Sequence, residues 1–298
     1  RAHSLPGRRR GVGSRRRGVE DHRTEEDPRE VQSDGGGERR RRLRHPALRR
    51  AREHPRPANL RRPRHARERV RHARGQSLPD WIALRSGNLE VFPDGVAYPV
   101  ASEDVRALLT YGREAEAIII PYGGGTSVVG HITPKKGVNP VLTIDMGRMN
   151  RLLGLDTESQ IATFGSGTAG PDVEAQLRAQ GFTLGHFPQS FEFSTLGGWI
   201  ATRSSGQQSL RYGRIEKLFA GGQVETPVGT LPIPSFPASA AGPDLREIIL
   251  GSEGRLGVLT EVKVRVTRLP ERERFHVMFF PDWHAAMDAV RRAVQGNI

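Results

Sequence analysis

The sequence has 298 residues, of which 46 are basic and 33 acidic, and it contains no cysteine. Its length allows a buried core, while the lack of cysteine excludes disulfides, thiolate metal ligands and a cysteine nucleophile within it. No apolar run approaches the roughly 18–20 residues of a membrane-spanning helix, and no apolar segment follows the arginine-rich start as a secretory signal requires.

The excess positive charge lies in residues 1–75, which hold 25 arginines, 10 acidic residues and no aromatic residue. Such a segment buries too little apolar surface to offset the entropy of ordering, so we predict that residues 1–75 are disordered. Three interpretations stay open: an arm attracted to phosphate-bearing partners, an inert tail, or a GC-rich gene translated in the wrong frame. Because Arg1 stands where an initiator methionine is expected, we expect a fragment or a processed product.

The first predicted elements surround a Pro-Asp-Gly turn at residues 93–95. Apolar and aromatic residues on both sides predict a small hairpin over residues 89–98. Ser102 is a candidate N-cap for a helix with an acidic first turn and apolar residues at helical spacing.

Strands and helices then alternate in part. A helix is predicted to begin at Pro171 and end at Gly181, and another to begin after Asp282 and end at Gly296. Strands are predicted at residues 117–120, 141–144, 160–164 and 261–266. Because the alternation is incomplete, the sequence favours the α+β class over a doubly wound sheet.

A Gly-Gly-Gly-Thr-Ser loop at residues 123–127 directly follows the strand at residues 117–120. Consecutive glycines let N–H groups converge on a phosphate or pyrophosphate, and Thr126 and Ser127 add hydroxyl donors. No Gly-Lys-Ser/Thr follows, which excludes a nucleoside-triphosphatase loop, and Val128 stands where a dinucleotide fingerprint has its third glycine. The alternative is a tight surface turn; we favour phosphate binding.

The loop at residues 165–170 does match the Gly-x-Gly-x-x-Gly fingerprint, follows a predicted strand and opens a predicted helix. Alone it indicates a nicotinamide-binding Rossmann domain. No acidic residue lies about twenty positions further on to hold a ribose, however, so we favour a different use for these glycines.

Further along, residues 185–213 interleave hydroxyl residues and glycines with Phe191, Phe193 and Trp199. That mixture suits a flat apolar ring with polar edges. Another glycine-rich loop, residues 251–257, leads into the last predicted strand. Several such loops in one short domain favour a single long, flat, phosphate-bearing ligand.

These motifs resemble the PCMH-type FAD-binding domain of the vanillyl-alcohol-oxidase superfamily. The phrase Gly-His-x-Pro-x-Ser-x-Glu-Phe-Ser-Thr-x-Gly-Gly-Trp at residues 185–199 resembles its alkyldihydroxyacetonephosphate synthase branch in particular. The resemblance runs from about His72 to the end and implies two α+β subdomains with FAD between them. It suggests an FAD-binding domain at residues 76–270 and the start of a C-terminal cap domain at residues 271–298.

The resemblance also implies which loops hold the cofactor. Residues 121–127 would wrap the pyrophosphate, residues 189–195 and 202–205 would line the flavin, and residues 253–259 would approach the adenine. The expected cofactor-binding residues are Pro121, Tyr122, Gly123, Gly124, Gly125, Thr126, Ser127, Gln189, Ser190, Phe191, Glu192, Phe193, Ser194, Thr195, Thr202, Arg203, Ser204, Ser205, Glu253, Gly254, Arg255, Leu256, Gly257, Val258 and Leu259.

Two histidines need separate interpretations. His186 matches a family histidine close to the flavin, so it is a candidate for proton handling or substrate contact, with simple packing as the alternative. Superfamily members that attach flavin covalently often use a histidine inside the first glycine loop, which has none here, so we expect noncovalent FAD. We interpret His131 as a surface or supporting residue, and we expect no metal.

In this branch a flavin nitrogen acts as a nucleophile while a fatty alcohol replaces the acyl group of acyl-dihydroxyacetone phosphate in ether-lipid synthesis. The resemblance implies that function; an FAD-linked oxidase or dehydrogenase of a 2-hydroxy acid, such as D-lactate or glycolate, is the alternative. A basic nucleic-acid-binding protein is a distant third.

The branch carries its main catalytic residues in the cap domain, so we expect this fragment to bind FAD without turnover. As partners we expect a lipid or hydroxy-acid substrate, a peripheral membrane contact and a homodimer, with no specific nucleic acid. The expected location is cytoplasmic.

Overall fold

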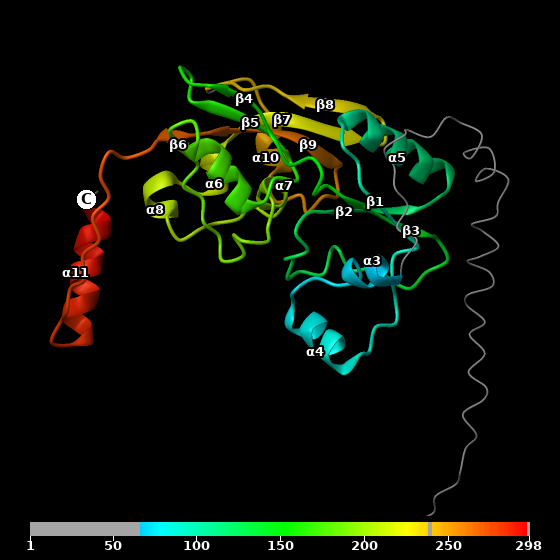
Figure 1. The fold of residues 1–298 in the computed structure, drawn as a ribbon, viewed down its shortest axis with the longest axis horizontal. Helices are drawn as coiled ribbons and strands as arrows, with labels where there is room; N and C mark the ends of the chain where they lie inside the picture. Colours follow the sequence, from blue (N-terminus) through cyan, green and yellow to red (C-terminus); the bar gives the residue numbers. More distant parts are fainter. Residues whose placement is uncertain (1–65, 238–239, 297–298) are drawn as a thin grey trace, which may run out of the picture.

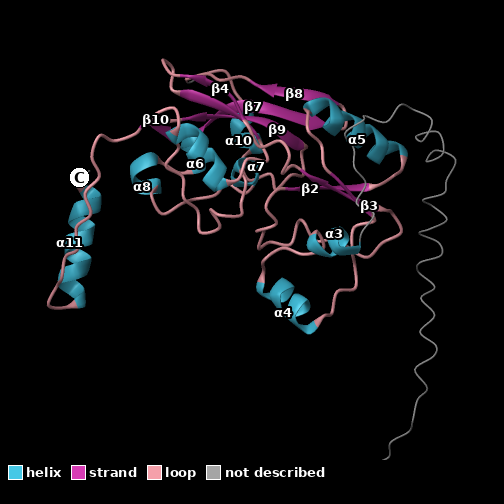
Figure 2. Cartoon of the chain, in the orientation of Figure 1, coloured by secondary structure: helices cyan, strands magenta, loops and turns pink. Residues whose placement is uncertain are grey.

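The structure, a computed structural model, describes residues 66–296 except residues 238–239. Figure 1 shows a five-stranded sheet along one side, with several short helices beneath it and a smaller three-stranded sheet beside them. Figure 2 shows the same arrangement by secondary structure. Helices and strands are mixed without a doubly wound sheet, so the predicted α+β class is confirmed.

The smaller sheet has the order β1-β3-β2, with all strands parallel. Its strands are β1 (Gly95–Ala97), β2 (Ile118–Tyr122) and β3 (Val141–Asp145). Helix α5 (Ser102–Glu114) connects β1 to β2, and its Val105, Leu108 and Leu109 pack with Ile144 of β3 in one buried cluster. The sheet ends at Tyr122 and Asp145, which are paired in register, so the glycine loop starts at this edge.

Two expectations in this region are wrong. Residues 89–98 form no hairpin, because β1 pairs with β3, from a distant part of the chain, in parallel. Ser102 is the first residue of α5 rather than its cap; Ala101 holds the cap position and makes no side-chain bond. The Asp104 carboxylate instead accepts a hydrogen bond from the Val100 N–H at 3.0 Å.

The larger sheet is antiparallel with the order β4-β5-β9-β7-β8. Its strands are β4 (Leu152–Asp156), β5 (Ile161–Gly165), β7 (Phe219–Thr226), β8 (Gly229–Ile233) and β9 (Val258–Arg265). Residues alternate along β9 between buried and half-buried, as the period of two in a strand requires. The largest buried cluster lies between this sheet and the helices beneath it.

The helices beneath the larger sheet are short. They are α6 (Gly170–Arg178), α7 (Leu196–Ala201), α8 (Ser209–Tyr212), α9 (Ile215–Leu218) and α10 (Leu245–Ile249), and a two-stranded ladder joins β6 (Phe182–Thr183) to β10 (Thr267–Arg268). The predicted helix at Pro171 is α6, which buries Val173 and Leu177 completely.

One buried carboxylate joins the two sheets. Glu225 of β7 is fully buried and accepts hydrogen bonds from Arg106 of α5 at 3.0 Å, from Thr230 at 2.7 Å and from Gln223 at 2.8 Å. Val258, the first residue of β9, packs in the same cluster as the α5 side chains. The two sheets are therefore connected by polar and apolar contacts.

The predicted boundary at residue 75 is too late. Helix α3 (Ala66–Arg71) is followed by His72 and Ala73, both fully buried, and then by helix α4 (Leu78–Ser86) with a capping box between Ser77 and Asp80. Residues 66–75 are thus part of the folded domain. Residues 1–65 of the predicted disordered segment lie outside the described residues.

At the other end, α11 (Trp283–Gln295) begins as predicted after Asp282, whose carboxylate accepts from the Ala285 N–H at 2.9 Å. None of its residues is buried, and Figure 1 shows it standing apart from both sheets. Within the part of the chain that the structure describes, no helix is long and apolar enough to cross a membrane.

Candidate functional site

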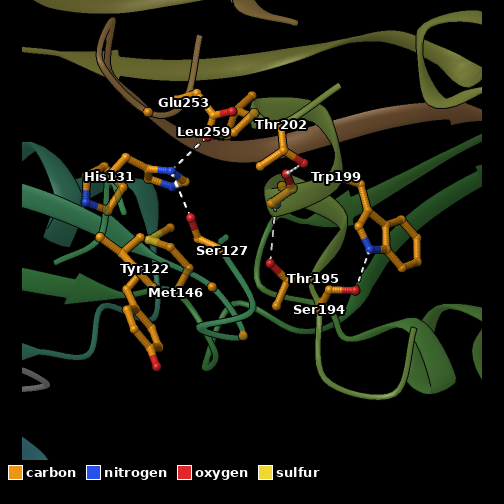
Figure 3. A pocket seen from close by; sticks show the side chains of 18 of the residues that line it. Tyr122, Ser127, His131, Met146, Ser194, Thr195, Trp199, Thr202, Glu253 and Leu259 are labelled. Atoms are coloured by element: carbon orange, nitrogen blue, oxygen red, sulfur yellow. Dashed lines mark hydrogen bonds and ion pairs between the residues drawn. The ribbon is translucent and has the colours of Figure 1, made fainter. Parts of the chain in front are cut away.

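A cavity of about 290 Å³ lies where the loops of the two sheets meet. Its walls come from residues 121–132, from the segment around α7, and from residues 252–259 at the start of β9. Figure 3 shows Tyr122, Ser127 and His131 on one side of it, and Thr195 and Thr202 on the other. Side chains from three separate parts of the sequence thus surround one space.

The glycine loop at residues 123–127 approaches neighbouring groups too closely for any side chain. A Cβ added at Gly124 would lie 1.7 Å from the Phe193 carbonyl oxygen, and one at Gly123 would lie 2.3 Å from Thr195 Oγ1. Gly125 has a left-handed φ of 72°, which favours glycine. Glycine is therefore required at all three positions.

The same loop leaves its donors free. Among the described residues, the backbone N–H groups of Gly124, Gly125, Thr126 and Ser127 donate to no protein acceptor. Gly125 is buried and Thr126 and Ser127 are half-buried, and backbone donors in such positions are normally paired. Together with the exposed Gly124 amide, these free donors beside a cavity form a binding surface for an anion such as a pyrophosphate. The loop therefore fits the phosphate-bearing part of a dinucleotide.

In the fingerprint loop at residues 165–170, most backbone amides are already paired within the protein. Its Gly165, Ser166 and Gly167 amides donate to the carbonyls of Arg151, Thr260 and Met149 at 2.9 to 3.0 Å. A Cβ at Gly167 would lie 1.8 Å from the Met146 carbonyl oxygen. These glycines allow close backbone packing, and the strand before them lies in an antiparallel sheet, so the Rossmann interpretation is wrong.

The wall around α7 is held by side-chain hydrogen bonds. Thr195 caps α7 by accepting from the Gly198 N–H at 3.3 Å, and the buried Trp199 donates from Nε1 to Ser194 Oγ at 2.7 Å. Phe191 stacks on Trp199 with ring centroids 6.3 Å apart. The hydroxyls and aromatic rings of this segment form a rigid, partly apolar wall.

His131 lies in the cavity wall, so it is not merely a surface residue. Its Nδ1 is 3.1 Å from Ser127 Oγ and 2.8 Å from Glu253 Oε2, which connects the glycine loop to the loop before β9 (Figure 3). Burial lowers the pKa of His131, while the adjacent Glu253 carboxylate raises it and Arg255 lowers it further.

His186 lies behind this wall rather than in it. It is 1% exposed, its ring contacts Trp199 edge-on at 5.0 Å, and its Nε2 is 2.8 Å from the hydroxyl of Ser204, which does line the cavity. Its buried Nδ1 has no hydrogen-bond partner among the described residues. Burial lowers the pKa of His186 to about 4, partly opposed by Glu216, so the ring is neutral at pH 7.

This pKa predicts how stability depends on pH. The unfolded chain binds a proton at His186 below about pH 6.5, whereas the folded chain binds it only below about pH 4. The unfolded state therefore binds more protons in this range, and the free energy of unfolding is expected to fall as pH falls from 6.5 to 4. Urea unfolding across this range measures it.

The control for this prediction is His284 on the exposed helix α11. We expect His186→Gln to reduce the pH dependence and His284→Gln to leave it unchanged. If the two variants have parallel stability profiles between pH 4 and 6.5, burial of His186 does not cause the effect.

Most of the expected cofactor-binding residues line the cavity. They are Pro121, Tyr122, Gly123, Gly124, Gly125, Thr126, Ser127, Ser190, Ser194, Thr195, Thr202, Ser204, Glu253, Gly254, Gly257, Val258 and Leu259. Outside the lining are Gln189, Phe191, Glu192, Phe193, Arg203, Ser205, Arg255 and Leu256. A sequence motif covers lining and non-lining residues alike, because the side chains of neighbouring loop residues point in different directions.

The sequence interpretation missed several lining residues. Some of them lie on segments with no glycine motif, and others lie within or just after a motif that was assigned another use. They are His131, Met146, Ser166, Trp199 and Val224. Trp199 carried a signal as an aromatic residue among hydroxyls, Ser166 lies in the fingerprint loop, and His131 was interpreted as a surface or supporting residue. No cluster of three or more His, Cys, Asp or Glu side chains suited to a metal ion occurs in the described residues.

Comparison with known proteins agrees with this geometry. Residues 93–232 match the family model described as an FAD binding domain. This chain contains an FAD-binding domain. The match spans both the free amides of the glycine loop and the wall around α7, and the FAD-binding domain has the PCMH-type fold found in its relatives.

The chain is also similar to longer proteins. It is 41% identical over 224 residues to the alkyldihydroxyacetonephosphate synthase of Dictyostelium discoideum, covering 75% of this chain and 37% of that protein. A solved alkyldihydroxyacetonephosphate synthase structure superimposes with a TM-score of 0.70 at 39% identity, over 76% of this chain and 41% of the other. The chain therefore spans less than half the length of these relatives.

Oxidoreductases are among the relatives as well. The mitochondrial D-lactate dehydrogenase [cytochrome] of Arabidopsis thaliana is 34% identical over 211 residues, covering 69% of this chain and 36% of that protein. The FAD-binding domain is thus shared by enzymes of two reaction classes.

Proposed function

We propose that this chain supplies the FAD site of an alkyldihydroxyacetonephosphate synthase-like enzyme, which exchanges the acyl group of acyl-dihydroxyacetone phosphate for a fatty alcohol. The observation that carries the proposal is the segment at residues 185–199, which builds the α7 wall and includes the buried His186 and Trp199. The similarity to the Dictyostelium synthase includes a larger share of the chain, at higher identity, than the similarity to the D-lactate dehydrogenase.

The residues of this chain have three tasks in that proposal. The free amides of Gly124 to Ser127 bind the pyrophosphate, and Thr195 and Thr202 bring hydroxyls to the flavin end of the cavity. The neutral His186 reaches the cavity through the Ser204 hydroxyl, so a proton can pass between that ring and the cavity by one hydroxyl. When bound, FAD would supply a nucleophilic ring nitrogen for the exchange.

We propose that FAD is bound noncovalently. The cavity residues 121–127 include no histidine, and the nearby His131 is engaged with Ser127 and Glu253. After acid precipitation of the loaded chain, the flavin is expected in the supernatant. Yellow protein in the washed precipitate would contradict this part of the proposal.

A domain exchange tests the reaction. Residues 66–298 replace the matching part of the Dictyostelium synthase. The assay measures conversion of acyl-dihydroxyacetone phosphate and labelled fatty alcohol to labelled alkyl-dihydroxyacetone phosphate and free fatty acid. The matched control carries Gly124→Asp, which places a carboxylate in the anion site. The proposal predicts exchange by the chimera and none by the control.

The same chimera distinguishes the oxidoreductase alternative. If it loads FAD yet exchanges no alcohol, and D-lactate or glycolate bleaches its flavin absorbance under anaerobic conditions, the transferase proposal is wrong. That result would assign the domain to a hydroxy-acid oxidoreductase.

A further inference from the structure

Residues 66–77, called the strap below, lie directly against the glycine loop. At the end of that loop, the Gln76 N–H donates to the Ser127 carbonyl at 2.7 Å. At its start, the Tyr122 hydroxyl lies 3.4 Å from the Arg71 carbonyl, to which it donates. The strap therefore contacts the loop at both ends.

His72 is the centre of the contact at the start of the loop. Its fully buried ring lies 4.3 Å from the Tyr122 ring, between centroids. Nδ1 is 2.7 Å from the Glu68 carbonyl and Nε2 is 2.8 Å from Asp145 Oδ2. Both contacts are to oxygen atoms, one on the backbone of α3 and one on the Asp145 side chain at the end of β3. His72 thereby ties α3 to the end of β3.

Tyr122 lies between His72 and the glycine loop. A Cβ on Gly125 would lie 2.1 Å from the Tyr122 hydroxyl, so the tyrosine side chain sits directly beneath the loop. The neighbouring Tyr98 also contacts α3: its hydroxyl donates to Glu68 Oε2 at 2.6 Å, and the Arg148 guanidinium lies over its ring. His72 thus contacts Tyr122, and Tyr122 in turn packs against the start of the loop.

Gly75 sets the approach at the other end. A Cβ there would lie 2.3 Å from the Ser127 carbonyl oxygen. That close approach lets the Gln76 N–H donate to the same oxygen, which holds the carbonyl at the end of the loop in place.

We propose that the strap is a positioning element for the FAD pyrophosphate loop, with His72 and Gly75 as its positioning residues, acting on the loop start through Tyr122 and on its end through Ser127. The proposal rests on FAD binding by the loop and not on the transferase activity. Its physical basis is preorganisation: amides held in place before binding lose less entropy when the ligand arrives.

The test uses the 298-residue chain and the variants His72→Gln and Gly75→Ala. The matched control is Gly154→Ala, because a Cβ on that exposed glycine of β4 meets no atom within 4 Å. The dissociation constant for FAD is measured by flavin fluorescence, and the unfolding temperature of the FAD-free protein is measured alongside. We expect each strap variant to raise the dissociation constant about tenfold, because about one hydrogen bond between loop and ligand is lost. The control is expected to leave the dissociation constant unchanged.

A double-variant cycle separates positioning from general destabilisation. If the strap acts through the loop, Gly75→Ala added to Gly124→Ala weakens binding less than it does alone, because the loop is already displaced. Additive losses, or an unchanged dissociation constant in both strap variants, overturn the proposal. If one strap variant does not fold, the other decides. If the parent chain binds no FAD, the FAD site and this proposal fall together.

Discussion

Replacing Gly124 by alanine is expected to weaken FAD binding about a hundredfold, which corresponds to the loss of roughly two hydrogen bonds between loop and pyrophosphate. The new Cβ would lie 1.7 Å from the Phe193 carbonyl oxygen, so either the glycine loop or the segment at residues 190–195 must move. Both segments line the cavity, so movement of either one displaces hydrogen-bond donors from the positions in which they would contact FAD. Equilibrium dialysis against FAD measures the effect.

The matched control is Gly137→Ala, in the connection from the glycine loop to β3. A Cβ there meets no atom within 4 Å and its φ is not left-handed, so affinity should stay at the parental value. Equal affinities in the parent and the Gly124 variant would show that the free amides are not the pyrophosphate site.

The two glycine loops show what local sequence can and cannot decide. Residues 165–170 match a dinucleotide fingerprint better than residues 123–127 do, yet only the second loop has free amides beside the cavity. The difference comes from the backbone carbonyls of Met146, Met149 and Thr260, which pack against the fingerprint loop at residues 165–170. Such contacts join distant parts of the chain and leave no local pattern, whereas several motifs taken together did indicate the ligand class.

A second large effect is expected at Glu174, where alanine should reduce the free energy of unfolding by on the order of 3 kcal/mol. This carboxylate on α6 is 6% exposed and accepts from the Leu184 and Gly185 N–H groups at 3.0 Å each, and from Thr183 Oγ1 at 2.7 Å. The substitution removes the acceptor of the buried Leu184 N–H and Thr183 hydroxyl, while the Gly185 N–H keeps its second acceptor, Thr183 Oγ1, at 3.1 Å. Urea unfolding at pH 7 measures the loss.

Arg178→Ala serves as the control for that variant. Arg178 pairs with Glu174 at 3.4 Å but is half exposed, and exposed ion pairs contribute little to stability. We expect a far smaller loss for Arg178→Ala than for Glu174→Ala. Equal losses would mean that the ion pair, and not the buried donors, accounts for the role of Glu174.

Glu174 also illustrates which features of the fold could not be predicted from local sequence. The start of α6 at Gly170 and the capping of α11 by Asp282 depend on residues within one turn, and the sequence predicted both closely. The role of Glu174 in fixing the loop before His186 depends on a neighbour ten residues away in sequence, as the pairing of β1 depends on β3. Residues 66–75 of the strap were missed because their arginine-rich composition resembles that of the preceding segment.

The link between Arg106 and Glu225 bears on how the cofactor enters and leaves. The cavity lies between two sheets that are joined by this buried carboxylate and by Val258, so rotating one sheet away from the other would expose a charge and break apolar packing. A clamshell opening is therefore disfavoured. We therefore expect FAD to exchange through movements of single loops, with a dissociation rate set by those loops rather than by a hinge between the sheets.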